Sequence, residues 1–121
     1  MNTSIKNHSV NLQKIADFLG VDTSLDLEVK GIASDSRALR AGDLFVALPG
    51  AKVHGASFID SAVGAKASAV LTDKAGIRLV DGKLPTLEIA NPRQILGELA
   101  SWFANSPSST FDLYGVTGTN G

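Results

Sequence analysis

Short apolar runs of strand length alternate along this chain with segments of helical periodicity, and this alternation limits the folds that it can adopt. Residues 44–48 are continuously apolar and end at Pro49 and Gly50, which is typical of a buried strand. Residues 12–19 carry apolar side chains at helical spacing and end at Gly20. Elements that alternate in this way indicate an α/β fold.

The complete pattern predicts a single small α/β domain, with a mixed sheet of about five strands and about three helices. The predicted strands cover residues 25–29, 44–48, 69–71, 86–89 and 111–116. The predicted helices cover residues 12–19, 57–64 and 91–103. Ser57 is the expected cap of the second helix, with Phe58 on its packed face, and Pro92 is expected at the first position of the third. Residues 76–82 are predicted to form a turn.

The composition argues against several classes of protein. With 11 basic and 12 acidic residues, the net charge of −1 gives no electrostatic case for binding nucleic acid or an anionic membrane. The absence of cysteine excludes disulfides and zinc-thiolate sites, and the isolated His8 and His54 make no metal set, so we expect no metal site. No apolar run resembles a signal peptide or a membrane helix, so the expected location is the cytoplasm.

The last residues read as a strand end that runs into a glycine loop. Gly118, Thr119, Asn120 and Gly121 form Gly-x-x-Gly, a spacing that lets backbone N–H groups surround phosphate oxygens. The strict phosphate-loop motif fails at its first glycine, where Val116 stands, and the chain ends before the motif's lysine. The spacing alone therefore fits a simple glycine-rich turn equally well.

A second polar cluster comprises Ser34, Asp35, Ser36 and Arg37, directly after an apolar stretch. Three short hydrogen-bonding side chains in a row suit a turn that is tied by its own side chains, or a pocket for a polar heterocycle. Asp35 and Arg37 also fit an exposed ion pair, which contributes little stability. The residues themselves leave these interpretations open.

Five segments follow one another in a distinctive order along the chain. They are Ser-Asp-Ser-Arg at 34–37, Gly-Asp-Leu-Phe-Val-Ala-Leu-Pro-Gly at 42–50, Phe-Ile-Asp-Ser-Ala at 58–62, Gly-Ala-Lys-Ala at 64–67 and Gly-Val-Thr-Gly-Thr-Asn-Gly at 115–121. In this order they closely resemble the N-terminal domain of the Mur ligases. The resemblance spans residues 27–121. It implies that residues 1–106 form the uridine-binding N-terminal domain. Residues 107–121 would be a linker with the first strand and glycine loop of a central ATP-binding domain.

The resemblance also implies roles for individual residues. Ser34 and Ser36 would contact the UDP-muramyl substrate, and Ala51, Lys52 and Val53 would form a loop facing them. The glycine loop at 118–121 would belong to the ATP site. No catalytic residue is expected within this chain.

The activity that the resemblance implies is acyl-phosphate chemistry in peptidoglycan precursor synthesis, and hence in cell wall biogenesis, cell shape and cell division. ATP with Mg²⁺ would phosphorylate the D-glutamate carboxylate of UDP-MurNAc-L-Ala-D-Glu, and an amine of diaminopimelate or lysine would then attack. This chain alone is expected to be inactive and to hold no cofactor. Its expected partners are the small-molecule UDP-MurNAc-dipeptide and the central and C-terminal domains of the same protein.

Two other functions compete with this one. The D-alanyl-D-alanine-adding Mur ligase shares such an N-terminal domain, but Thr119 and Asn120 resemble the loop of the diamino-acid-adding ligase more closely. Folylpolyglutamate synthetases share that loop but lack the upstream segments. The second alternative is a non-catalytic nucleotide-binding module that keeps the fold.

The chain departs from the family pattern at one place. The family commonly shows Asp-Gly-His before the phenylalanine of the second helix, whereas this chain has His54, Gly55 and Ala56 there. His54 is interpreted as a solvated loop residue and not as a catalyst.

Overall fold

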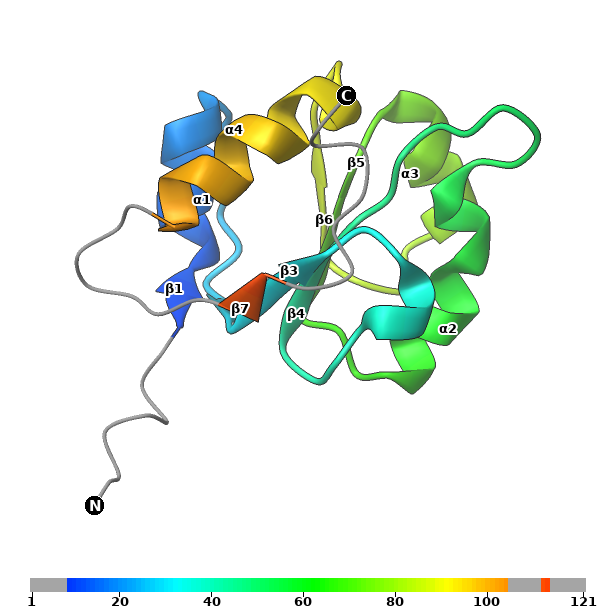
Figure 1. Cartoon of the computed structure of the whole chain (residues 1–121), viewed down its shortest axis with the longest axis horizontal. Coiled ribbons are helices and arrows are strands. Elements are labelled where there is room, and N and C mark those ends of the chain that lie inside the picture. Colours follow the sequence, from blue (N-terminus) through cyan, green and yellow to red (C-terminus); the bar gives the residue numbers. More distant parts are fainter. Residues whose placement is uncertain (1–8, 105–111, 114–121) are drawn as a thin grey trace.

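A computed structural model of the chain describes residues 9–104 and 112–113, and these residues form three layers (Figure 1). The central sheet comprises β3 (Gly31–Ala33), β4 (Asp43–Val46), β5 (Ala69–Thr72), β6 (Thr86–Glu88) and β7 (Asp112–Leu113). Its order is β6-β5-β4-β3-β7, and every neighbouring pair is parallel. A separate antiparallel pair joins β1 (Val10–Asn11) to β2 (Glu28–Val29).

Helices cover both faces of the sheet. The α-helices are α1 (Leu12–Leu19), α2 (Ile59–Gly64), α3 (Lys74–Val80) and α4 (Pro92–Ala104), with short 3₁₀ helices η2 (Ser36–Ala38) and η3 (Gly55–Phe58). Helices α1 and α4 pack on one face, and α2, α3 and η3 pack on the other (Figure 1). No helix in the described ranges has the length and apolar character needed to span a bilayer.

The two faces of the sheet explain why β4 and β5 read as continuous apolar runs. Leu44 and Val46 point into the core under α1 and α4, whereas Phe45 points into the core under α2 and α3. All three are at most 1% exposed. A parallel strand buried on both faces has no reason to alternate polar and apolar residues.

The predicted α/β fold is confirmed, and the main sheet has five strands as predicted, but β3 (Gly31–Ala33) stands in it in place of the strand predicted at 25–29. The prediction of one mixed sheet is wrong in its pairing. All neighbouring strands of the main sheet are parallel, and the antiparallel pair β1–β2 forms a separate small sheet. The helix at 12–19 is confirmed and ends at Gly20, whose φ of 77° suits glycine. Pro92 begins α4 as predicted. The strand predicted at 25–29 is reduced to Glu28–Val29.

The turn predicted at 76–82 is wrong, because α3 occupies most of it. Asp73 caps this helix by accepting a hydrogen bond from the Gly76 N–H at 2.8 Å, and the helix ends at Asp81 with a left-handed φ of 53°. Gly76 signals a turn in the sequence, but the structure requires it for close packing. A Cβ there would overlap the Thr72 hydroxyl and lie 2.8 Å from His54 Cε1.

The predicted cap at Ser57 is also wrong. Ser57 lies inside η3, and α2 begins at Ile59. The residue in the cap position of α2 is Phe58, which makes no capping hydrogen bond with its side chain. The side chain that caps this region is His54, which accepts from the Ala56 N–H. A histidine in the cap position is not a usual cap signal in a sequence, so the cap was assigned to the nearest serine.

Gly76→Ala and Gly97→Ala are expected to change stability in opposite directions, although both glycines lie inside helices. Gly76→Ala should destabilise the chain by about 1–3 kcal/mol, because the new methyl group overlaps the side chain of Thr72, the last residue of β5. Gly97→Ala should stabilise it by about 0.5–1 kcal/mol, since nothing lies within 4 Å of the added Cβ on α4. Urea unfolding of both variants checks this, and a destabilising Gly97→Ala would contradict the described packing of α4.

Candidate functional site

The direction of the strands places the candidate site at one edge of the sheet. Because all five strands are parallel, the segments that follow β3, β4, β5 and β6 leave from the same edge. The chain proceeds from β3 to β6 in one direction, whereas β7 lies on the other side of β3. In open α/β sheets, ligands bind outside the carboxyl ends of the strands where the order reverses in this way.

A cleft of about 640 Å³ lies beside the carboxyl end of β3. We refer to it as the β3–η3 cleft. One wall is the segment after β3, and the other is formed by β4, η3 and α2. Its lining residues are Ser34, Asp35, Ser36, Arg37, Phe45, Gly55, Phe58 and Ser61. The structure therefore brings both predicted serines into one cavity.

Asp35 shapes the first wall of the cleft. Its carboxylate caps η2 by accepting from the Arg37 N–H at 2.9 Å. The Arg37 guanidinium donates to the same carboxylate through Nε at 3.0 Å and Nη2 at 2.9 Å. The Arg37 side-chain hydrogen bonds, followed by the backbone one, hold the pKa of Asp35 below its ordinary value. The polar cluster thus ties its own turn and lines a cleft at once.

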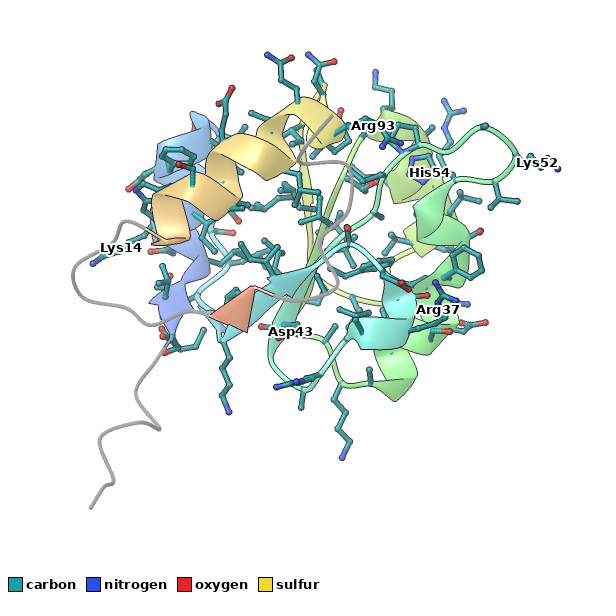
Figure 2. The ribbon with its side chains drawn as sticks, in the orientation of Figure 1. Lys14, Arg37, Asp43, Lys52, His54 and Arg93 are labelled. Carbon is teal, nitrogen blue, oxygen red and sulfur yellow. The ribbon has the colours of Figure 1, made fainter. Side chains whose placement is uncertain are left out.

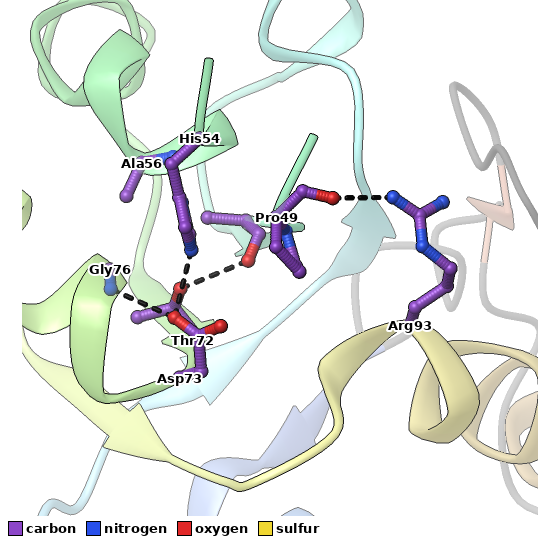
Figure 3. A network of polar contacts seen from close by, with 8 residues as sticks. Pro49, His54, Ala56, Thr72, Asp73, Gly76 and Arg93 are labelled. Carbon is purple, nitrogen blue, oxygen red and sulfur yellow. Dashed lines mark hydrogen bonds and ion pairs between the residues drawn. The ribbon is translucent and has the colours of Figure 1, made fainter. Parts of the chain in front are cut away.

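His54 shapes the opposite wall, and its interpretation as a solvated loop residue is wrong. Its side chain is only 12% exposed. Its Nδ1 accepts from the Ala56 N–H at 3.0 Å, and its Nε2 lies 2.8 Å from Asp73 Oδ1 (Figure 3). The imidazole therefore connects the start of η3 to the start of α3.

Asp73 receives two polar contacts at its Oδ1 atom. The Gly76 N–H donates to it at 2.8 Å, and His54 Nε2 lies at the same distance. Burial raises the pKa of Asp73, but the hydrogen bonds from Gly76 and then His54 outweigh that effect, so the pKa lies below its ordinary value. The charged carboxylate is the form that this site favours.

The predicted facing loop does not line the cleft. Ala51, Lys52 and Val53 are exposed, and Figure 2 shows Lys52 at the outer end of its loop. The loop is fixed at its start, where Arg93 Nη2 donates to the Pro49 carbonyl at 2.6 Å (Figure 3). The role of these three residues in binding stays a prediction.

Sequence reasoning missed several residues of the cleft. Phe58 was placed on a packed helix face, yet it is 47% exposed at the cleft. Gly55 and Ser61 also line it, and Asp73 supports it from behind. The resemblance marked 58–62 as a family segment but gave those residues no role, and no local pattern points to Asp73. These contacts join segments that are distant along the chain.

The remaining predictions about sites fall outside the structural description. The predicted ATP-site residues Gly118, Thr119, Asn120 and Gly121 lie outside the described residues. Within the described ranges, no group of three or more histidine, aspartate or glutamate side chains could hold a metal ion. The boundary predicted at 106/107 also lies outside them, although β7 pairs with β3 in the same sheet.

Comparison with known proteins identifies the family. The model described as "Mur ligase family, catalytic domain" matches residues 28–104. The chain belongs to the Mur ligase family. This confirms the resemblance that the segments at 34–37 and 42–50 carry.

Individual Mur ligases show the extent of the similarity. The chain is 46% identical over 112 residues to a UDP-N-acetylmuramoyl-L-alanyl-D-glutamate–2,6-diaminopimelate ligase of Streptomyces coelicolor, covering 91% of the chain. It is 41% identical over 114 residues to a UDP-N-acetylmuramyl-tripeptide synthetase of Leifsonia xyli. The chain spans 22% of the length of each of these relatives.

Solved structures agree on the family. A MurF structure from Acinetobacter baumannii matches with a TM-score of 0.55 and 28% identity. That match covers 67% of this chain and 17% of the MurF chain.

Asp73→Asn is expected to reduce stability near neutral pH and to lose that effect in acid. The folded-state pKa of Asp73 lies below the unfolded one, so its contribution is present above the unfolded value of about 3.9 and is lost as pH falls through the folded pKa. Asparagine can still accept from Gly76 and His54, but as an uncharged and weaker acceptor. The free energy of unfolding at pH 6 should therefore be about 1 kcal/mol lower in the variant than in the unsubstituted chain. Urea unfolding at pH 6 and below pH 3 measures this difference in free energy at the two pH values.

Asp60→Asn is the control for the removal of a charge, because Asp60 forms an exposed pair with Lys83. An undiminished difference in acid would contradict this assignment.

Proposed function

We propose that this chain is the UDP-substrate-recognition part of an ATP-dependent amide ligase. The complete enzyme would add a diamino acid, diaminopimelate or lysine, to UDP-MurNAc-L-Ala-D-Glu during peptidoglycan precursor synthesis. Family membership and the relatives named for this reaction support the proposal. The described residues would bind and orient the nucleotide end of the substrate, while ATP, with Mg²⁺, would supply the phosphoryl group elsewhere in the protein.

The single observation that carries the proposal is the β3–η3 cleft beside the carboxyl end of β3, the strand next to which the order reverses. Its volume of about 640 Å³ falls within the range of small-molecule sites. Two serines predicted to contact the substrate, Ser34 and Ser36, lie in its lining. The cleft therefore combines the family's expected residues with a position at the carboxyl edge of the parallel sheet, where ligands of such sheets bind.

The chemistry of the lining fits a pyrimidine nucleotide. Uracil offers one N–H donor and two carbonyl acceptors, and serine hydroxyls both donate and accept hydrogen bonds. The exposed ring of Phe58 provides an apolar face on which a base can stack. Arg37, whose side chain is 88% exposed, places a guanidinium at the same cleft, and guanidinium groups pair well with phosphate oxygens.

Two alternatives to this function are another ligase of the family and a non-catalytic nucleotide-binding module. The match to the diaminopimelate ligase covers 91% of the chain at 46% identity, whereas the MurF match covers 67% at 28%, which favours the diamino-acid-adding ligase over MurF. A non-catalytic nucleotide-binding module would use the same cleft. The presence or absence of ATP-dependent ligation in the full-length protein separates it from a ligase.

Ser36→Ala is expected to weaken binding of UDP several-fold, since one hydrogen bond contributes about 0.5–1.5 kcal/mol. The test is an NMR titration of the 121-residue chain with UDP up to millimolar concentration. In the unsubstituted chain, the shifted amides should cluster at residues 34–37 and 55–61. Ser57→Ala is the matched control, because Ser57 is exposed on η3 and does not line the cleft.

Three results would count against the proposal. The first is the absence of any shift at millimolar UDP, and the second is a cluster of shifts away from the cleft. The third is equal weakening by Ser36→Ala and Ser57→Ala, which would indicate a general loss of structure. Additional shifts at residues 51–53 would support the predicted facing loop.

A further inference from the structure

A side chain that does not line the cleft constrains its η3 wall. His54 caps η3, and the two residues of η3 that line the cleft, Gly55 and Phe58, lie one and four positions after it. The imidazole reaches Asp73, 19 residues further along, at 2.8 Å. Asp73 is in turn fixed as the cap of α3.

The two contacts of His54 require one tautomer of the neutral ring. Nδ1 accepts the Ala56 N–H at 3.0 Å, so it carries no proton. The proton must then reside on Nε2, which donates it to Asp73 Oδ1. Both ring nitrogens are thus used, and the ring orientation is fixed by two elements at once.

We refer to the contact between His54 and Asp73 as the link. Neighbouring residues leave the link little freedom to move. Gly76 allows α3 to approach so closely that a Cβ would lie 2.8 Å from His54 Cε1. Thr72, the residue before Asp73, is fully buried and donates to the Ala47 carbonyl at 2.9 Å (Figure 3). The Gly55 N–H closes the base of the loop by donating to the Leu48 carbonyl at 2.7 Å.

We propose that His54 and Asp73 are positioning residues of the nucleotide cleft, which together hold η3 at the distance from Ser34 and Ser36 that the ligand requires. The inference rests on the proposed function for the identity of the ligand, UDP. It goes beyond that function by assigning a role in binding to two residues outside the lining of the cleft. Without the link, η3 keeps its own cap but loses the side-chain contact that ties it to the start of α3.

The chain allows variants that break the link and keep both helix caps. His54→Asn retains a side-chain acceptor for the Ala56 N–H, since asparagine is a good N-cap, but is too short to reach Asp73. Asp73→Ser retains a cap for α3 and is also too short. Asp73→Asn is the matched control, because its amide oxygen can accept from both Gly76 and His54.

Each link-breaking variant is expected to bind UDP about fivefold more weakly than the unsubstituted chain, the factor given by one ordinary hydrogen bond. The double variant His54→Asn/Asp73→Ser should bind no more weakly than either single one, because both remove the same interaction. Asp73→Asn should bind within about twofold of the unsubstituted chain. Imidazole ¹⁵N shifts should show His54 protonated at Nε2 in the unsubstituted chain and in Asp73→Asn.

Two measurements separate failure of this inference from failure of the proposed function. If the unsubstituted chain binds UDP and the link-breaking variants bind equally well, or if the two losses add in the double variant, the positioning role is overturned and the proposed function stands. If the unsubstituted chain does not bind UDP, the proposed function fails. Hydrogen exchange at residues 55–58 then decides the inference: faster exchange in the link-breaking variants than in Asp73→Asn upholds it, and equal exchange in all of them overturns it.

Discussion

Parallel pairing of β3, β4 and β5 is the constraint on which the rest of this structure depends. It buries the strands on both faces and places all their carboxyl ends at one edge. The buried polar side chains of the described core serve the connections of this sheet. Asp43 accepts from the Arg40 N–H at the entry to β4, and Thr72 donates to the Ala47 carbonyl just beyond its end. The sheet thus fixes where its polar loops leave, and the cleft forms between them.

The two walls of the cleft are built by the same local device. Each is a short 3₁₀ helix capped by its own preceding side chain, Asp35 for η2 and His54 for η3. Each cap also makes a second polar contact, but the partners differ in kind. Asp35 pairs with Arg37, two residues away and exposed, whereas His54 pairs with Asp73 on another element and in a mostly buried setting. An exposed local pair stabilises little, whereas the His54–Asp73 pair ties the η3 wall to a second element.

What the sequence predicts well is what a local pattern determines. Helical periodicity with a terminal glycine predicted α1, and the short polar side chains after β3 were consistent with a turn or a pocket, of which the structure shows both. The sequence failed at α3, because Gly76 serves close packing and not a turn. It also missed Phe58 and Asp73, since their positions depend on how η3 and α3 meet after the sheet has formed. Contacts between distant segments leave no periodic signal in a single sequence.

The departure from the family pattern lies at this same wall, and the structure gives it a physical meaning. The pattern Asp-Gly-His supplies a carboxylate and an imidazole from one short segment. Here the imidazole comes from His54 and its carboxylate partner from Asp73, 19 residues later. This pair joins η3 to α3 and restrains the two elements relative to each other, and preorganisation of this kind lowers the cost of ordering a site when its ligand binds.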